Sequence, residues 1–144
     1  MDEVGTGLLI KQLFIGSIVI AATVAIHAEM LAIMTKNSPK LMQLSRAHLR
    51  RFSETGFITA GVLYILLALT IEVWIWAFVL MATGAVAGLE PAVYFSLVSF
   101  TTLGFGDITL STEWRLMSAL IGANGFLLFG WSTAYMVELI RRTG

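Results

Sequence analysis

Three long hydrophobic runs restrict what this chain can fold into more than any other feature. They occupy residues 8–34, 57–87 and 116–140, and each is long enough for an α-helix to cross a bilayer, which takes about 20 apolar residues. A water-soluble domain of 144 residues has no place for so much apolar surface, since 58% of the residues are hydrophobic and only 12% are charged. The sequence therefore predicts an all-α membrane protein with three transmembrane helices.

The remaining composition excludes several classes of partner and site. The formal net charge is zero, so there is no basic excess of the kind that binds nucleic acid. Cysteine is absent, which excludes disulfide scaffolds, thiolate metal sites and thiol nucleophiles. The first hydrophobic run is led by Asp2 and Glu3 and is longer than the core of a signal peptide, so we interpret it as a retained helix.

A fourth hydrophobic run, at residues 92–100, has only about half the spanning length. It is opened by Glu90 and Pro91 and leads directly into the sequence GFGD. Such a segment can enter a membrane and return if its non-helical backbone is buried in protein or lines a watery cavity. We therefore expect a re-entrant segment between the second and third spans.

The distribution of basic residues predicts how the chain is oriented. Lys and Arg in short loops stay on the cytoplasmic side, and they gather in the loop between the first two spans and in the tail: Lys36, Lys40, Arg46, Arg50, Arg51, Arg141 and Arg142. With three spans between the two ends, the N-terminus then lies outside and the connection over residues 84–113 is extracellular. We expect a multi-pass protein of the plasma (cell inner) membrane whose re-entrant segment enters from outside.

The basic loop itself contains a helix-start signal. Ser38 suits an N-cap and Pro39 a first helical position, which predicts a short interfacial helix within residues 36–56. Its basic side chains suit contact with anionic lipid, either as a topological anchor or as a lipid-sensing gating element. Residues 1–35 then form an extra transmembrane helix, which we expect to pack outside the second span.

The string SFTTLGFGD at residues 99–107 carries chemistry suited to a cation. A dehydrated cation needs several oxygens around one axis, and backbone carbonyls supply them only if successive residues alternate in conformation. Gly104 and Gly106 permit this alternation, because glycine accepts positive φ without steric cost. Thr102 adds a hydroxyl, and the short helix before the string points its partially negative carbonyl end toward the same place.

This string resembles the selectivity filter of tetrameric pore-loop potassium channels, whose commoner form is TVGYG. The likeness extends over residues 57–141 and is to the two-helix pore of bacterial potassium channels. It implies a pore domain at 57–144 that comprises an outer helix at 57–87, a re-entrant pore helix at 90–101, a filter loop at 102–107 and an inner helix at 114–141.

The resemblance also implies which atoms hold the permeant ion. K⁺ is expected as the transported ion, with no organic cofactor, on carbonyl oxygens and one threonine hydroxyl of the filter residues Thr102, Leu103, Gly104, Phe105 and Gly106. One pore loop supplies only a quarter of such a filter, and a closed ring requires identical subunits about a common axis. A C4 homotetramer is therefore implied, with further copies of the chain and membrane lipid as partners.

The surroundings of the filter partly follow the family pattern. The residues expected to support the filter are Tyr94, Phe95, Val98, Thr101 and Asp107. Tyr94 and Phe95 occupy the positions of the usual aromatic pair. Phe105 replaces the usual filter tyrosine and has no hydroxyl to brace the filter, and Val98 stands where some members have a glutamate.

Counted forward from the filter along the inner helix, the resemblance implies five residues at the gate or cavity: Asn124, Gly125, Phe126, Phe129 and Thr133. Two roles are open for Gly125: a hinge that opens the cytoplasmic gate, or the close packing that small residues often serve in membrane helices. For Asn124 the alternatives are an interhelical hydrogen bond and a place in the cavity lining.

Three intramembrane ionisable residues are candidates for function, because such side chains are costly inside a bilayer: His27, Glu29 and Glu72. His27 and Glu29 are two positions apart and so lie on different faces of their helix, which makes a shared metal site unexpected. Glu29 either pairs with Arg50 or Arg51, or it belongs with His27 to a proton- or ligand-sensitive gate.

Glu72 lies nearer the middle of the membrane than the other two. We expect it to be too far along the second span to meet His27, and to be protonated or hydrogen-bonded to Ser17 or Thr23 instead.

The residues and the resemblance together predict a potassium-selective channel and not an enzyme. One alternative is a weakly selective monovalent cation channel, and another is a non-conducting regulatory channel subunit, against which the complete filter string argues. An intramembrane hydrolase that uses His27, Glu29 and Glu72 is disfavoured, because these residues face one another poorly and no nucleophile is paired with them.

Overall fold

The computed structural model describes residues 3–48 and 53–143. Four helices make up this part of the chain: α1 (Glu3–His48), α2 (Ser53–Ala82), α3 (Leu89–Phe100) and α4 (Arg115–Thr143). Three of them are long and apolar enough to cross a membrane, over Gly5–Asn37, Thr55–Ala82 and Arg115–Arg141. The predictions of an all-α chain and of three transmembrane helices are confirmed.

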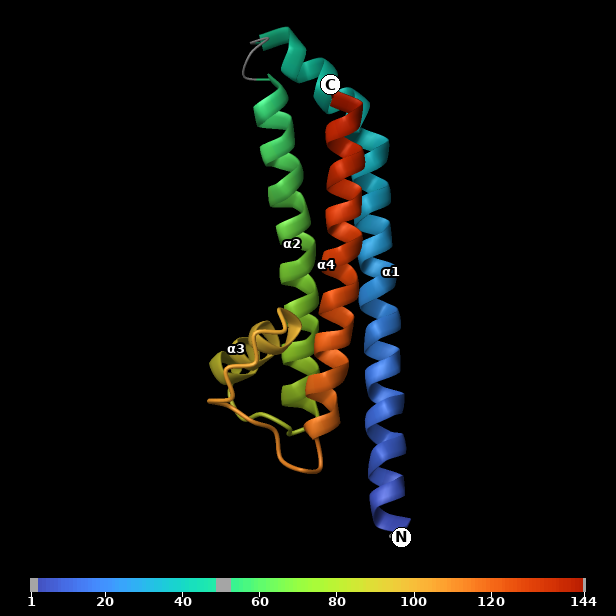
Figure 1. The fold of residues 1–144 in the computed structure, drawn as a ribbon, viewed down its shortest axis with the longest axis vertical. Helices are drawn as coiled ribbons and strands as arrows, with labels where there is room; N and C mark the ends of the chain where they lie inside the picture. Colours follow the sequence, from blue (N-terminus) through green and yellow to red (C-terminus); the bar gives the residue numbers. More distant parts are fainter. Residues whose placement is uncertain (1–2, 49–52, 144) are drawn as a thin grey trace.

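The three long helices run side by side, and α3 lies obliquely at one end of them (Figure 1). The N-terminal end of α1 lies at the end of the bundle that carries α3, and the C-terminal end of α4 lies at the opposite end. Both α2 and α4 pack against α1. α1 thus packs against the second span, as expected, and it also contacts the third span, which the sequence did not predict.

The first helix continues without interruption through Ser38 and Pro39, where the sequence predicts a separate interfacial helix. Proline removes one backbone hydrogen bond and bends a helix without necessarily ending it, and the last part of α1 turns away from the bundle axis in Figure 1. The expected lipid contact depends on basic side chains whose placement is not described, namely those of Lys40, Arg46, Arg50 and Arg51.

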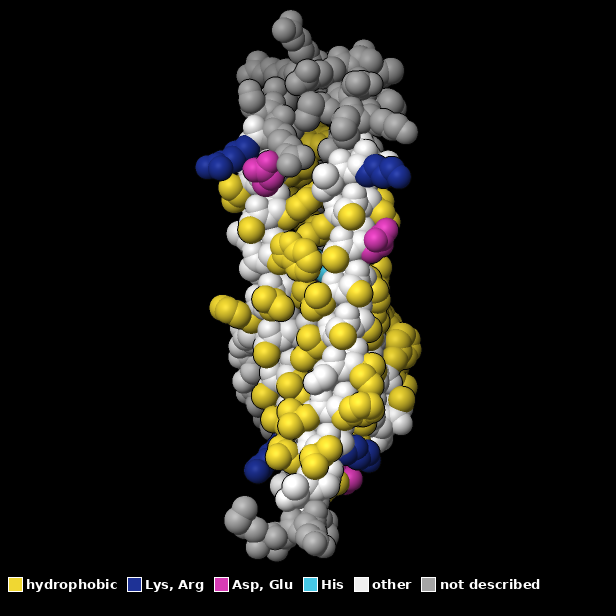
Figure 2. Space-filling model, turned by 90° about the vertical axis from the view of Figure 1, so that its right-hand side faces the viewer, with side chains coloured by type: hydrophobic (Ala, Val, Ile, Leu, Met, Phe, Trp, Pro, Cys, Tyr) yellow, Lys and Arg dark blue, Asp and Glu magenta, His cyan; other side chains and the backbone are white. Residues whose placement is uncertain are grey.

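The apolar core lies where α3 packs between α2 and α4. Its largest fully buried hydrophobic side chains are Trp76, Leu80, Phe100, Met117, Ile121 and Leu128. Elsewhere the long helices expose large apolar side chains, and Figure 2 shows hydrophobic atoms over the middle of one face, with Lys and Arg toward its two ends. This distribution suits a protein surrounded by hydrocarbon along its length.

The position of α3 brings its C-terminal end deep into the bundle. The helix starts after Gly88, whose φ of 94° only glycine adopts easily, and its first turn carries Glu90, which favours the positive end of the helix dipole. It ends against Gly125 of α4. Because Gly125 lies almost three turns from the start of α4, the end of α3 reaches about 15 Å along the bundle.

Candidate functional site

The sequence TLGFGD at residues 102–107, here called the TLGFGD segment, follows the end of α3 directly. Positive φ occurs at every second residue, with values of 61° at Thr102, 57° at Gly104 and 78° at Gly106. The alternation of conformation that the two glycines indicate is therefore present. Such alternation turns successive carbonyl groups toward the same side of the chain, which a straight strand or a helix does not do.

Thr102 extends this alternation to a residue where the sequence did not predict it. A β-branched residue with positive φ is a genuine outlier, and such a conformation costs about 1–3 kcal/mol. Glycine at this position would avoid the cost, so the threonine side chain is retained in spite of strain. No pattern of residue types identifies this position beforehand.

The inner part of the TLGFGD segment is held by the last turn of α3. The amides of Leu103 and Gly104 both donate to the carbonyl of Val98, at 3.0 and 3.3 Å. The amide of Thr102 donates to the carbonyl of Ser99, at 2.9 Å. Val98 thus supports the segment through its carbonyl, while its side chain is buried.

The outer part of the segment is held by a side-chain hydrogen bond. The hydroxyl of Tyr94 donates to Oδ2 of Asp107 at 2.6 Å, and the amide of Ile108 donates to the other carboxylate oxygen at 3.1 Å. The bond from Tyr94 lowers the pKa of Asp107, and the same bond raises the pKa of Tyr94. Two residues predicted to support the filter are thereby brought together.

The other two expected support residues belong to α3 and its C-cap. Phe95 is buried in the core between α3 and the long helices. The hydroxyl of Thr101 donates to the carbonyls of Leu97 and Val98, at 2.7 and 3.3 Å, and so closes the end of α3.

The TLGFGD segment is open on the side away from α3. All six of its residues are exposed in the single chain, and the large apolar side chains of Leu103 and Phe105 are 62% and 67% exposed. Apolar side chains exposed in this way form a candidate contact surface.

Gly125 of α4 is the point at which the end of α3 touches the long helix. A Cβ at Gly125 would collide with the carbonyl oxygen of Phe100 and would lie 2.9 Å from Cγ of the same residue. Of the two roles considered for Gly125, close packing is therefore the one that this geometry supports. α4 runs as one helix from Arg115 to Thr143 through this contact.

The remaining residues expected at the gate or cavity separate into two groups. Phe126 is 75% exposed, Phe129 is 36% exposed and Thr133 is exposed, and the ring of Phe129 lies 5.7 Å from that of Phe100. Asn124 is instead buried, and its amide nitrogen donates to the hydroxyl of Thr23 in α1 at 2.8 Å. Of its two alternatives, the interhelical hydrogen bond is the one present.

Comparison with known proteins agrees with this geometry. The sequence profile of a family described as "Ion channel" matches residues 64–142, which is more than half of the chain and includes α3, the TLGFGD segment and nearly all of α4. The chain belongs to this ion-channel family. No curated protein and no solved structure matches the chain.

In this channel, all of α1 lies outside the matched region, and a buried polar centre joins it to the other two long helices. The Nδ1 atom of His27 lies 2.8 Å from Oε1 of Glu72, and its Nε2 atom lies 3.1 Å from the hydroxyl oxygen of Ser132. His27 and Glu72 are completely buried and Ser132 is 5% exposed. We call these three residues the histidine centre.

The histidine centre corrects the expectation that Glu72 cannot reach His27. The two residues are nearly equally far from the connection between α1 and α2, so these antiparallel neighbours place them at about the same height. This count along the sequence would have identified the pair. Thr23 instead bonds Asn124, as described above, and Ser17 is exposed.

Glu29 lies apart from the histidine centre. It is exposed, as its place on another face of α1 predicts, and its expected partners Arg50 and Arg51 lie outside the described residues. Ser132, His27 and Glu72 make contacts in the order of a hydrolase triad. The argument that the ionisable residues face one another poorly therefore holds for Glu29 but is wrong for His27 and Glu72, and the argument that no nucleophile is paired with them is also wrong. The three residues in contact are nevertheless buried, and the hydroxyl of Ser132 is closed to a substrate.

Further polar contacts join α1 to α4 along the channel subunit. The side-chain oxygen of Gln12 accepts a hydrogen bond of 3.0 Å from the amide of Leu116, one of the unpaired donors of the first turn of α4. The hydroxyls of Thr35 and Tyr135 lie 2.9 Å apart. Sequence analysis did not predict these contacts, because each depends on the register between helices that are distant in the chain.

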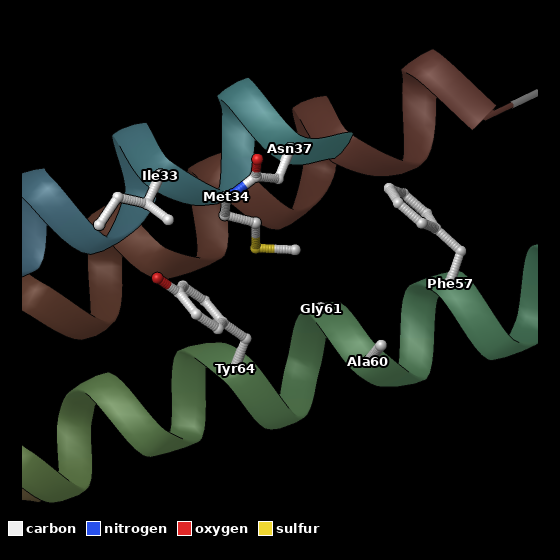
Figure 3. Close-up of a pocket in the computed structure, with 7 residues that line it drawn as sticks. All are labelled: Ile33, Met34, Asn37, Phe57, Ala60, Gly61 and Tyr64. Carbon is white, nitrogen blue, oxygen red and sulfur yellow. The ribbon is translucent and has the colours of Figure 1, made fainter. Parts of the chain in front are cut away.

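A cavity of about 250 Å³ lies between α1 and α2, toward the end of the bundle opposite α3 (Figure 3). It is lined by Ile33, Met34, Asn37, Phe57, Ala60, Gly61 and Tyr64. These side chains provide no carboxylate or cluster of carbonyl oxygens for an ion, so the cavity is separate from the TLGFGD segment in both place and chemistry.

Proposed function

We propose that this chain is one subunit of a homotetrameric, potassium-selective channel that conducts K⁺ through its TLGFGD segment. The observation that carries the proposal is the positive φ at Thr102, Gly104 and Gly106. A backbone of this kind can present consecutive carbonyl oxygens to one axis, which is how potassium filters replace the hydration shell of the ion. The coordinating atoms are the carbonyls of residues 102–105 and the Thr102 hydroxyl, with Gly106 closing the alternation.

The exposure of the TLGFGD segment supports a fourfold assembly. A single chain provides one wall of a filter, and three further copies about a common axis complete the ring. Leu103 and Phe105, which are largely exposed in one chain, are then covered by neighbouring subunits. The exposed face of α4 with Phe126, Phe129 and Thr133 borders the conduction path below the filter.

The placement of α3 supports its role as a re-entrant pore helix. Its C-terminal end reaches about halfway into a bilayer of about 30 Å, and the partial negative charge there favours a cation next to Thr102. In the proposed topology the TLGFGD segment opens to the outside, the N-terminus is outside and the C-terminus is cytoplasmic. The surrounding membrane is the plasma (cell inner) membrane.

One feature favours a second candidate, a weakly selective cation channel. Phe105 has no hydroxyl with which to brace the filter from behind, and a looser ring of carbonyls discriminates less between K⁺ and Na⁺. The bond between Tyr94 and Asp107 supplies an alternative brace at the outer end. This bond is the reason why we place the selective channel first.

The test is flux of K⁺ and Na⁺ through the purified chain in liposomes, with Ba²⁺ as blocker. Gly104→Ala and Gly84→Ala are a matched pair, because both glycines have positive φ and open space where a Cβ would stand. Only Gly104 lies in the TLGFGD segment. We expect Gly104→Ala to abolish a K⁺ flux that Gly84→Ala retains.

The other outcomes select among the alternatives. Equal K⁺ and Na⁺ flux supports the weakly selective channel. Flux that survives Gly104→Ala contradicts conduction through this segment. Absence of flux in all variants favours a non-conducting subunit, and the mass of the particle in mild detergent decides separately whether four copies assemble.

A further inference from the structure

The histidine centre joins one residue from each long helix inside the membrane. We propose that His27, Glu72 and Ser132 form a proton-binding site, and that the loss or gain of its proton shifts α4 against α1 and α2. Nothing in ion conduction through the TLGFGD segment requires such a centre. Its ligand is the proton, and the element that it moves is the helix that borders the conduction path.

Both nitrogens of the imidazole are engaged, each with a different helix. Nδ1 meets Oε1 of Glu72 in α2 at 2.8 Å, and Nε2 meets the hydroxyl of Ser132 in α4 at 3.1 Å. A serine hydroxyl can donate or accept. The contact with α4 therefore survives a change of imidazole tautomer or charge, but the direction of its hydrogen bond reverses.

Burial decides how many protons the pair holds. When the carboxylate of Glu72 is ionised and the imidazole of His27 is neutral, the pair has a charge of −1. One added proton, on either group, gives the pair no net charge. An unpaired charge removed from water costs several kcal/mol, so the neutral state is favoured in the membrane. The second carboxylate oxygen of Glu72, Oε2, has no hydrogen-bond partner among the described residues, which also disfavours an ionised carboxylate.

The surrounding helices offer no other charge that would compensate. On α1 the nearest ionisable residue is Glu29, which is exposed on another face. Glu72 is the only charged residue of α2 between positions 55 and 82, and α4 has none between 116 and 137. The Tyr135 hydroxyl of α4 is bonded to Thr35, and Glu90 of α3 is exposed in the first turn of that helix.

The third neighbour of the imidazole is aromatic. The ring of Trp131 in α4 lies 5.4 Å from the ring of His27, tilted by 51°. Together with the two hydrogen bonds, this contact surrounds the imidazole with groups from α2 and α4. A proton that leaves the pair therefore leaves a net charge that only separation of the helices and entry of water can relieve.

The position of Ser132 explains why α4 responds. It lies next to Thr133 and less than one turn from Phe129, both on the exposed face of α4. Nearer the start of α4, Asn124 is held separately by Thr23. Separation of the helices at the charged pair thus acts on the part of α4 beyond Asn124, which also contacts α1 through the hydroxyls of Tyr135 and Thr35, while the part beside α3 stays in place. All of α1 lies outside the matched channel region, so the imidazole of the histidine centre comes from a helix that the family profile does not include.

Proton binding is tested on the imidazole itself. The chain has two histidines, His27 and His48, so His48→Gln leaves a single imidazole for nitrogen-15 NMR of the full chain in lipid bilayers. We expect the His27 signals to titrate, and Glu72→Gln to change the proton affinity by about tenfold or more, which is one pH unit of midpoint. A signal that does not titrate, or a midpoint that Glu72→Gln leaves unchanged, overturns the proposal.

Coupling to α4 is tested with a spin label. The chain has no cysteine, so Val137→Cys, at an exposed position of α4, carries one label whose mobility and water accessibility report the helix. We expect a change over the pH range in which His27 titrates. Ser132→Ala removes this change but keeps the titration, and Ser132→Thr restores it.

A matched control is Ser118→Ala, because the hydroxyl of Ser118 donates to the carbonyl of Arg115 within α4 itself. This variant keeps the wild-type response. A label that responds equally in Ser132→Ala, or that never responds, overturns the coupling. Neither measurement depends on flux, so failure of the proposed conduction and failure of the proton site are distinguished.

Discussion

The TLGFGD segment and the histidine centre are built in opposite ways. The segment is exposed, its form resides in backbone dihedral angles, and the bonds that hold it join residues at most 13 positions apart. The histidine centre is buried, it consists of side chains, and its two bonds join residues 45 and 105 positions apart. A chain can therefore specify one functional element locally while another depends entirely on how distant helices align.

The two regions should also respond differently to substitution. Backbone strain at the segment is a cost that the fold tolerates, so changes there alter ion discrimination more than stability. The buried centre contributes to stability only while both members of its pair are present. The variants below test this contrast, from the largest expected effect to the smallest.

Replacing His27 by leucine should give the largest loss of stability. The substitution leaves Glu72 buried without its partner, and breaking a buried pair in this way costs about 3–5 kcal/mol. The double variant His27→Leu with Glu72→Leu removes both polar groups and should recover most of the loss. Reversible denaturant unfolding in lipid or detergent measures both variants, and equal losses in the single and double variants would contradict a coupled pair.

Adding a methyl group at Gly125 should cost nearly as much, about 3 kcal/mol, at the upper end of the range for overpacked cores. The new Cβ collides with the backbone carbonyl of Phe100, which cannot rotate away as a side chain can. Gly130→Ala is the matched control on the same helix, since no atom lies within 4 Å of its added Cβ. It should gain up to about 1 kcal/mol, because alanine favours a helix more than glycine does.

The two glycine variants also decide between packing and hinge motion. If Gly125→Ala unfolds as easily as the wild type but slows the opening of the channel, then Gly125 serves as a hinge and the packing interpretation fails. Unfolding and single-channel recording on the same preparation separate these outcomes.

Thr102→Gly, in the TLGFGD segment, should raise the stability of the fold, whereas His27→Leu and Gly125→Ala should lower it. Glycine adopts the φ of 61° without strain, so stability should rise by about 1 kcal/mol. Loss of the hydroxyl should reduce the ratio of K⁺ to Na⁺ flux. Thr102→Ser keeps a hydroxyl and most of the strain, so it should retain the ratio; a ratio that is unchanged in Thr102→Gly would exclude the hydroxyl from ion coordination.

The sequence predicts the part of this fold that depends on local chemistry. Long apolar runs identify the three spans, and Gly104 and Gly106 identify the alternating backbone, because each property belongs to residues that are neighbours in the chain. Tyr94 and Asp107 also meet as expected, since both lie close to the end of α3. The strained conformation of Thr102 has no such signal.

Contacts between distant helices are the part that composition and periodicity do not reveal. Ser132 was not singled out, and Glu72 was assigned to other partners, because a serine or a glutamate in an apolar run shows only that a partner exists. The partner follows from helix register, which for α1 and α2 is nearly set by their antiparallel connection. The end of α1 illustrates a different limit: a Ser-Pro start signal occurs inside a continuing helix.

The smallest effect is expected for Tyr94→Phe, which removes the outer brace of the TLGFGD segment. The pKa of Asp107 is lowered by this bond, so the stabilisation is present above the ordinary aspartate value of about 4 and is lost as the pH falls through the lowered value. The pKa of Tyr94 is raised, so the stabilisation persists up to about pH 10 and is lost as the pH rises through the raised value.

At neutral pH we therefore expect Tyr94→Phe to lower the ratio of K⁺ to Na⁺ flux by about threefold, as the loss of one exposed hydrogen bond allows. Acidification should lower the wild-type ratio toward that of the variant and leave the variant nearly unchanged. Tyr135→Phe is the matched control, because its hydroxyl bonds Thr35 between α1 and α4, far from the segment. If both variants lower the ratio equally, the effect comes from a general loosening of the helices. The contrast between a filter held by local contacts and a centre held by contacts between distant helices then does not hold.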